Sequence, residues 1–121
     1  MVIAFVEDLL FKSKIRAVAQ AAGAAISFAR GSDDVDGMVR KGSPELILID
    51  LEGRSGDAIE TIRAIRAAAG SGTRIIGFGS HVNVDRLRAA KEAGCDQALA
   101  RSAFVQILPN LLLPSSTGAV E

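Results

Sequence analysis

The stretch LILIDLEGRS, residues 46–55, places a single carboxylate, Asp50, near the end of an apolar run. The residues around it, Leu46 to Ile49 and Leu51, are of types that proteins usually bury. A near-continuous apolar run is typical of a strand covered on both faces of a parallel sheet. Because a buried charge needs a partner, the stretch predicts a central strand and a nearby group that neutralises Asp50.

Four other short apolar runs share this character: VIAFV (2–6), AISFA (25–29), RIIGF (74–78) and CDQALA (95–100). Between the runs, apolar residues recur at helical spacing, starting at Phe11 and again at Ala58. Strand and helix thus alternate five times, which is the pattern of a parallel sheet covered by helices. We therefore expect an α/β, doubly wound fold with five parallel strands in the order 2-1-3-4-5 and helices on both faces.

The expected helices also have recognisable ends. Four glycines close a helical segment shortly before the next strand, as left-handed C-caps do: Gly23, Gly42, Gly70 and Gly94. Ser32, followed by two aspartates, predicts an N-cap with acids in the first turn. Ser55 and Asn83 are the candidate N-caps of the next two helices.

Composition limits the class of protein. The 121 residues suit one domain over residues 1–113, with a small polar tail, 114–121, that we expect to be disordered. The 14 basic and 14 acidic residues balance, so the chain lacks the basic surface of a nucleic-acid binder. One cysteine, Cys95, excludes an intramolecular disulfide, and the N-terminal apolar run is too short to span a membrane. We expect a stand-alone cytoplasmic domain without a signal peptide, membrane contact or attached output domain.

Acidic side chains follow the predicted first and third strands. In this fold, ligand sites form beyond the carboxyl ends of the strands, where the strand order reverses. That geometry brings Glu7 and Asp8 next to Asp50, while the fourth strand ends near Ser80 and the fifth at Arg101. Carboxylate oxygens suit a hard cation such as Mg²⁺, and a carboxylate beside it can act as the nucleophile that accepts a phosphoryl group.

Three stretches resemble the response-regulator receiver domains, the CheY-like family. FVED (5–8) is similar to the acidic pair that closes the family's first strand. PELILIDL (44–51) is similar to its third-strand motif, which carries the phosphorylated aspartate. AAKEAGCDQALARSAF (89–104) resembles its fourth helix and fifth strand. The resemblance covers residues 2–113 and implies the flavodoxin-like (CheY-like) form of the doubly wound fold.

The resemblance implies a role for each acid. Asp50 would be the phosphoacceptor, and Glu7, Asp8, Asp50 and the backbone carbonyl of Glu52 would bind Mg²⁺, weakly. It also implies a signalling domain of two-component, phosphorelay type that is not an enzyme. Such a domain acts by binding a protein, a kinase or an effector.

The chain departs from the family pattern in its switching residues: Arg101 replaces the Lys, Ser102 the Pro and Ala98 the aromatic of the fifth strand. Gly79 falls where the family has Thr or Ser, and Ser80 takes that place only if the loop is one residue shorter. These departures indicate a divergent or pseudo-receiver variant. They leave open whether the acidic pocket around Asp50 still accepts a phosphoryl group.

A second class of function is a small nucleotide- or cofactor-binding protein or enzyme on the same fold. GFGS (77–80) lacks the spacing of a dinucleotide or P-loop motif, and no His/Cys set has zinc spacing. His81 is interpreted as a loop residue and Cys95 as a small core residue. We favour the signalling module because little chain remains from which to build a substrate pocket.

The C-terminal segment SAFVQILPNLLL (102–113) is apolar and interrupted by Pro109. Because proline breaks or starts a helix, we expect a helix to about Ile107 and a restart at Pro109. Three consecutive leucines, residues 111–113, cannot all face one core, so at least one is expected to be exposed. The segment is then a candidate site for a homodimer or a protein partner, with a lid folded on the sheet as the equal alternative.

Arg101 is the predicted counter-charge of Asp50. The fifth strand ends on the same edge as the third, and Gly79 between them has no side chain to block the reach. A guanidinium is long, planar and always charged, which suits paired carboxylates. We expect Arg101→Ala to destabilise the fold and raise Mg²⁺ affinity, and Asp50→Asn to be milder.

Overall fold

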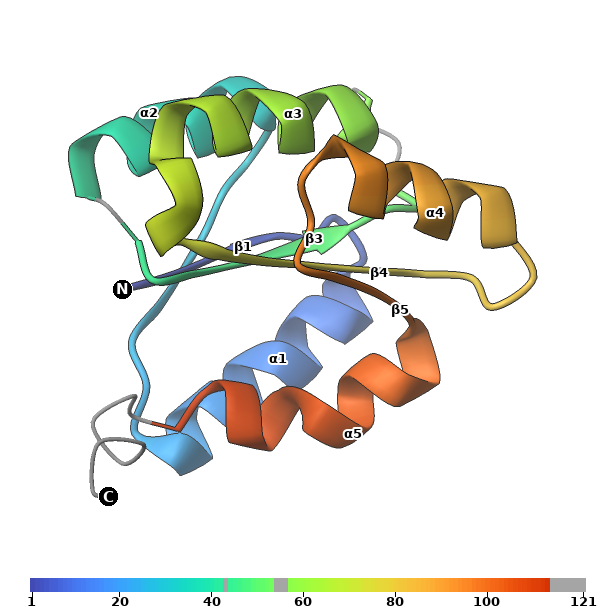
Figure 1. Ribbon diagram of the computed structural model, residues 1–121. Coiled ribbons are helices and arrows are strands. Elements are labelled where there is room, and N and C mark those ends of the chain that lie inside the picture. The colour runs from blue at the N-terminus through green and yellow to red at the C-terminus, as the bar shows by residue number, and fades with distance from the viewer. Residues whose placement is uncertain (43, 54–56, 114–121) are drawn as a thin grey trace, which may run out of the picture.

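The computed structural model describes residues 1–42, 44–53 and 57–113 (Figure 1). Strands and helices alternate in the predicted order: β1 (Val2–Phe5), α1 (Leu9–Ala22), β2 (Ile26–Phe28), α2 (Ser32–Gly42), β3 (Leu46–Asp50), α3 (Ala58–Ala69), η1 (Gly70–Gly72), β4 (Arg74–Gly79), α4 (Val84–Ala93), β5 (Gln97–Ala100) and α5 (Arg101–Leu111). The tail 114–121 and Ser55 lie outside the described residues. Within the described ranges, no helix is long and apolar enough to cross a lipid bilayer.

The five strands form one parallel sheet in the predicted order, β2-β1-β3-β4-β5. β3 lies at the centre, hydrogen-bonded to β1 on one side and β4 on the other. At the carboxyl ends of the strands, Asp50 lies beside Phe78 of β4, and Gly79 lies beside Ala100 of β5. Because all strands point the same way, this one edge carries the ends of β1, β3, β4 and β5.

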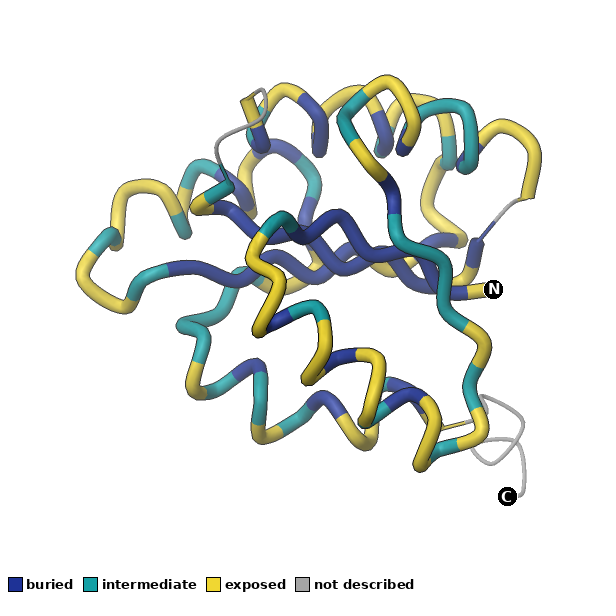
Figure 2. Tube along the Cα trace, turned by 180° about the vertical axis from the view of Figure 1, so that it is seen from behind, coloured by how far each residue is buried: buried dark blue, intermediate teal, exposed yellow. Residues whose placement is uncertain are grey.

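Helices cover both faces of the sheet, with α1 and α5 on one side and α2, α3 and α4 on the other (Figure 1). The position of β3 between the two helix layers explains why its sequence is apolar without alternation. Ile47 and Ile49 pack in the cluster under α2–α4, whereas Leu46 and Leu48 pack in the cluster under α1 and α5. Both faces of the strand are therefore buried, as the dark central part of Figure 2 shows.

The predicted helix ends are confirmed at Gly23 and Asn83 but not elsewhere. Gly42 and Ser32 lie within α2 instead of capping it, and Gly70 and Gly94 follow α3 and α4 with positive φ but outside the left-handed helical region. Gly23 closes α1 in the left-handed conformation, with φ 71° and ψ 23°. Asn83 caps α4 by accepting a hydrogen bond from the Arg86 backbone N–H. The cap of α3 is a correction, because Asp57 rather than Ser55 accepts the Ile59 backbone N–H.

The predicted break in the C-terminal helix is wrong. α5 runs without interruption from Arg101 to Leu111 and includes Pro109. Pro109 lies in the last turn, on the exposed side of the helix. Continuing the helix buries Leu108 and Leu112 on one face, and this burial decides the outcome. Leu113 is 49% exposed, which confirms that the leucines do not share one core.

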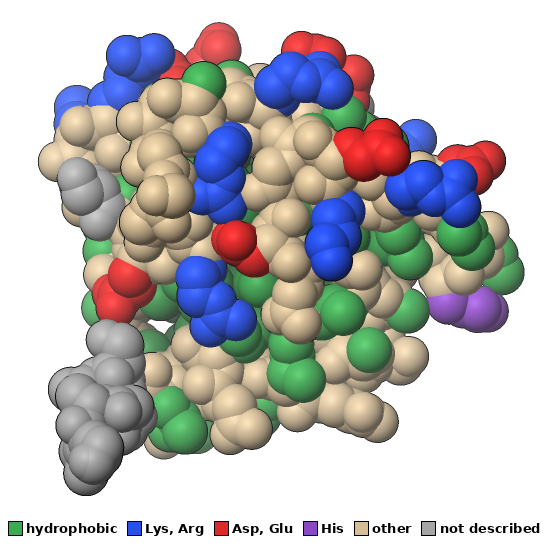
Figure 3. All heavy atoms as spheres, in the orientation of Figure 1, with side chains coloured by type: hydrophobic (Ala, Val, Ile, Leu, Met, Phe, Trp, Pro, Cys, Tyr) green, Lys and Arg blue, Asp and Glu red, His purple; other side chains and the backbone are tan. Residues whose placement is uncertain are grey.

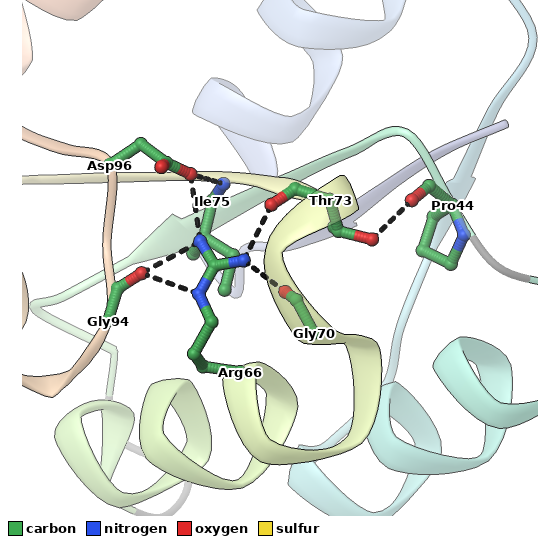
Figure 4. A network of polar contacts seen from close by, with 7 residues as sticks. All are labelled: Pro44, Arg66, Gly70, Thr73, Ile75, Gly94 and Asp96. Atoms are coloured by element: carbon green, nitrogen blue, oxygen red, sulfur yellow. Dashed lines mark hydrogen bonds and ion pairs between the residues drawn. The ribbon is translucent and has the colours of Figure 1, made fainter.

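A polar network fixes the opposite edge of the sheet, where β3, β4 and β5 begin (Figure 4). The Arg66 guanidinium donates to the carbonyls of Gly70, Thr73 and Gly94 and to the Asp96 carboxylate. Asp96 also accepts the Ile75 backbone N–H at 2.8 Å. Residues from α3, β4 and the loop before β5 are thus tied together away from the candidate site.

Candidate functional site

Asp50 lies where the sequence predicts, at the carboxyl end of the central strand. Asp50 is only 5% exposed, and its Oδ1 accepts a hydrogen bond from the Glu52 backbone N–H at 2.9 Å. The position follows from the sheet, because four apolar residues of β3 are buried before it and leave the carboxyl group at the rim. A carboxylate held this way has one oxygen fixed by the backbone and the other turned to its neighbours.

Arg101 is the neighbour, as predicted. Its Nη2 lies 3.7 Å from Asp50 Oδ2. Arg101 is the first residue of α5, directly after β5, so the end of the strand places it at this edge. Its guanidinium carbon also lies 4.8 Å from the centroid of the Phe11 ring of α1. The cation therefore touches both a buried carboxylate and an aromatic face.

The two N-terminal acids flank the same space. Asp8 is the N-cap of α1, and its Oδ1 accepts the backbone N–H groups of Leu10 and Phe11 at 2.9 and 3.1 Å. Glu7 lies against Gly53, because a Cβ added to Gly53 would be 3.4 Å from Glu7 Oε2. A hollow of about 420 Å³ is lined by Glu7, Asp8, Asp50, Glu52, Gly53 and Arg101. The structure thus brings the predicted acids and the predicted cation to one place.

Burial raises the pKa of Asp50 above its ordinary value of 3.8. Loss of water around the carboxyl group is the main cause, and the Glu52 backbone N–H and the Arg101 guanidinium oppose it. The negative charges of Glu52 and Asp8 add to the rise. Arg101 therefore offsets only part of the rise in the pKa of Asp50. The hydrogen bond from the Glu52 backbone N–H lowers this pKa more than the Arg101 guanidinium does.

The Glu52 side chain occupies a place that sequence analysis did not foresee. Its carboxylate lies over Gly79, since a Cβ added there would be 3.0 Å from Glu52 Oε2. The same oxygen accepts the Ser80 backbone N–H at 3.4 Å and lies 3.9 Å from Arg86 Nε. Arg86 in turn donates to the Leu51 carbonyl at 3.1 Å. The missing side chain at Gly79 was the one sequence signal that could have indicated this arrangement.

Gly79, and not Ser80, ends β4 and faces the site edge. The Ser80 hydroxyl oxygen accepts the Val82 backbone N–H at 3.3 Å, so it shapes the turn before α4. A second hollow of about 420 Å³ shares Glu52 and Arg101 with the first and is also lined by Gly79, Ser80, His81, Ala100 and Ser102. Arg101 and Glu52 therefore stand between two adjoining spaces at this edge.

The donor set is compatible with a hard divalent cation. The first hollow offers carboxylate oxygens from Glu7, Asp8 and Asp50, and both capping bonds of Asp8 use Oδ1 alone. Within the described ranges, however, no three Asp, Glu, His or Cys side chains converge into a complete metal site. Mg²⁺ suits such an arrangement, because it takes one or two carboxylates and completes its shell with water and a phosphate oxygen.

Cys95 lies apart from this chemistry. It is buried in the cluster under α2–α4, as predicted for a small core residue. Burial raises the pKa of its thiol to about 12. A thiol of this kind is unreactive, so Cys95 has a packing role.

The sequence matches no protein-family model and no curated protein. Solved structures, in contrast, share its fold. A two-component response regulator from Clostridium difficile superposes with a TM-score of 0.80 at 16% identity, over 98% of this chain and 95% of that chain. A response regulator from Burkholderia pseudomallei, which holds a phosphorylated aspartic acid, a calcium ion and citrate, gives 0.79 at 17%, over 98% and 69%. The beryllofluoride-activated NtrC4 receiver domain dimer gives 0.73 at 15%, over 92% and 97%. The chain therefore has the flavodoxin-like fold of CheY-like receiver domains.

Proposed function

We propose that this protein is a receiver-type signalling domain of divergent kind, with Asp50 as its phosphoacceptor, and that its output is the binding of another protein. The observation that carries the proposal is the hollow at the carboxyl edge of the sheet. There the Asp50 carboxylate at the end of the central strand shares the hollow with the two acids that follow β1 and with the Arg101 guanidinium of α5. The fold supports this interpretation, because solved structures that share it are response regulators with a phosphorylated aspartic acid or a beryllofluoride-activated state.

The chemistry requires an ionised Asp50. A carboxylate oxygen forms a bond to the phosphorus of a phosphodonor, the bond from phosphorus to the donor's leaving atom breaks, and the leaving group takes that electron pair. Arg101 lies close enough to hold oxygens of the incoming group, since it stands 3.7 Å from Asp50 and is shared by both hollows. Because burial raises the pKa of Asp50, transfer should increase as pH rises through that pKa.

Glu7 and Asp8, with Asp50 and the backbone carbonyl of Glu52, would hold Mg²⁺ in the first hollow. When bound, Mg²⁺ neutralises charge that builds up on phosphoryl oxygens. Arg101 already supplies a positive charge to the same space, so it weakens the binding of a further cation.

The departure from ordinary receivers lies in the switch. The place beside Asp50 where a hydroxyl would meet a phosphoryl oxygen is Gly79, and the Glu52 carboxylate covers it. Ala98 is small, so this position of β5 carries no large side chain that could switch between two orientations. We propose that phosphorylation acts here through the charge balance among Asp50, Glu52 and Arg101 rather than through a hydroxyl.

The partner is a kinase, an effector or a second copy of this chain. Over α3 and α4, Figure 3 shows Lys and Arg side chains interspersed with Asp and Glu side chains, with hydrophobic side chains beside them. Val82 and Val84, 75% and 55% exposed, lie at the start of α4. Leu113, at the end of the C-terminal segment, is a further exposed apolar residue and supports the homodimer predicted through that segment.

Backbone NMR tests the proposal. Mg²⁺ is added first and beryllium fluoride second, with Mg²⁺ and fluoride alone as the control. We expect beryllium fluoride to move the amides of residues 7–8, 50–53, 79–80 and 101, and Asp50→Asn to abolish these shifts. Unchanged amides around Asp50 in the wild-type protein would contradict the phosphoacceptor role.

A further inference from the structure

Arg101 is held from two sides. One side is the Asp50 carboxylate at 3.7 Å, and the other is the ring of Phe11, whose centroid lies 4.8 Å from the guanidinium carbon. The Arg101 side chain is 41% exposed, so burial alone does not fix it. A long charged side chain at a half-open edge samples many rotamers unless contacts select one. The ring is the contact that can select one here.

The ring of Phe11 is itself immobilised by a small aromatic cluster. It packs tilted against Phe78 of β4 at 5.1 Å and Phe104 of α5 at 6.1 Å, measured between centroids. Phe78 and Phe104 stack on each other at 4.2 Å. Phe11 is only 9% exposed. The surface that Arg101 rests on is therefore built from α1, β4 and α5 together.

Phe11 also contacts the acidic side of the site, through its backbone. Its N–H donates to Asp8 Oδ1 at 3.1 Å as part of the α1 cap. The same residue thus touches a predicted cation ligand with its main chain and the site's cation with its ring. Among the described residues, Phe11 alone combines a ring contact to Arg101 with a hydrogen bond to Asp8.

We propose that Phe11 is a positioning residue that holds the Arg101 guanidinium against Asp50. The proposal deepens the proposed function and rests on it where phosphoryl-group binding is concerned. A planar guanidinium can lie on an aromatic face and still donate in its own plane, whereas an ammonium is a compact, strongly hydrated point charge. The pair Phe11–Arg101 therefore works as one unit, and Arg101→Lys is not a conservative change at this site.

The first test needs no ligand. We compare wild type, Phe11→Leu, Phe11→Trp and Phe28→Leu by NMR of arginine Nε–H groups. Phe28 is the matched control, because its ring lies 4.9 Å from the guanidinium carbon of Arg16 and so carries a different cation. We expect Phe11→Leu to remove the ring-current shift of Arg101 Nε–H and increase its mobility. Phe11→Trp should restore both, and Phe28→Leu should change Arg16 alone.

The second test is a double-mutant cycle on the affinity for beryllofluoride in the presence of Mg²⁺. A half-exposed cation–π contact corresponds to about a twofold to fivefold change in an equilibrium constant. We expect Phe11→Leu to weaken binding by about that factor, and Arg101→Lys to have less effect in the Phe11→Leu background than in wild type.

The outcomes separate the two proposals. If beryllofluoride does not bind the wild-type protein, the proposed function fails, while the Nε–H signals still decide the role of Phe11. If Phe11→Leu leaves Arg101 Nε–H unchanged, or Phe28→Leu changes it equally, the positioning role is refuted. Phe11→Trp keeps the test decisive if Phe11→Leu does not fold, because a ring that holds Arg101 must preserve both the signal and the affinity.

Discussion

Asp50, the proposed phosphoacceptor, lowers the stability of the fold when it is ionised. Its raised pKa means that the folded state favours the protonated carboxyl group, so the ionised group destabilises the protein above its folded pKa. That cost shrinks as pH falls through the folded pKa and is gone below the ordinary value of 3.8, where the carboxyl group is protonated in the unfolded chain as well.

Asp50→Asn should therefore raise the free energy of unfolding at neutral pH, because the amide keeps an acceptor for the Glu52 N–H and loses the buried charge. The difference from wild type should shrink as pH falls towards 3.8. Urea unfolding across pH measures this. Asp85→Asn, at a side chain 95% exposed, is the control. A gap that widens with acid would contradict the assignment.

Arg101→Ala should cost only about 0.5–1 kcal/mol of stability, since its side chain is 41% exposed and water screens the pair. It should raise Mg²⁺ affinity, because the hollow then keeps its acids without their cation. Calorimetric titration with Mg²⁺ and chemical unfolding measure the two effects. Arg88→Ala, which removes an exposed pair on α4, controls for net charge; equal Mg²⁺ affinity in both variants would refute the idea.

At the scale of elements, the junction of β4 and α4 is held by a residue from the loop after β3. Glu52 covers Gly79 and accepts the Ser80 N–H, while Arg86 of α4 bonds Leu51 and faces Glu52. Three segments thus meet over one glycine.

Gly79→Ser should displace Glu52, because a Cβ would be 3.0 Å from its Oε2 and 3.3 Å from Leu51 Cβ. The flexible carboxylate can move, so the fold should survive, and the amide of Ser80 should exchange faster with solvent. Hydrogen exchange read by NMR measures this. Gly31→Ser, where a Cβ meets nothing within 4 Å, should leave Ser80 unchanged.

α5 tolerates a proline that it would be more stable without. Pro109→Ala restores a helical N–H in the last turn, and we expect a net gain of about 1 kcal/mol after the loss of proline's stiffening of the unfolded chain. Thermal unfolding measures the gain, with Asn110→Ala as the neighbouring exposed control. A loss of stability would show that Pro109 is needed for the path of the chain beyond the helix.

At the scale of the molecule, the fold was predictable because local patterns and the sheet agree. Apolar runs, helical spacing and terminal glycines all indicated the same alternation of five strands and helices. The common order of such sheets then supplied the topology and placed Asp50 near Arg101. Long-range contacts limited what could be predicted from the sequence. The path of α5 depends on burial of Leu108 and Leu112, and the positions of Glu52 and Phe11 depend on neighbours from other elements, which no local spacing encodes.

The C-terminal segment gives a prediction for the assembly. Leu112 is 3% exposed, so an aspartate there would disrupt the core rather than report on association. Leu113, 49% exposed, is the position to change. If the segment forms the proposed homodimer, Leu113→Asp should shift the protein to monomer in sedimentation analysis, with stability nearly unchanged. Ser102→Asp, at the exposed start of α5, is the control. A wild-type monomer at all concentrations would exclude this homodimer.

The Arg66 network has a consequence for how freely the rest of the chain can vary. It ties α3, β4 and the loop before β5 together at the edge where the strands begin, far from the acids and Arg101. The loops at the other edge are thereby released from holding the sheet in register. A sequence built in this way can exchange those loops between homologues, or accept designed ones, and keep its scaffold. Arg66 should then be kept unchanged in any variant that carries such exchanged loops.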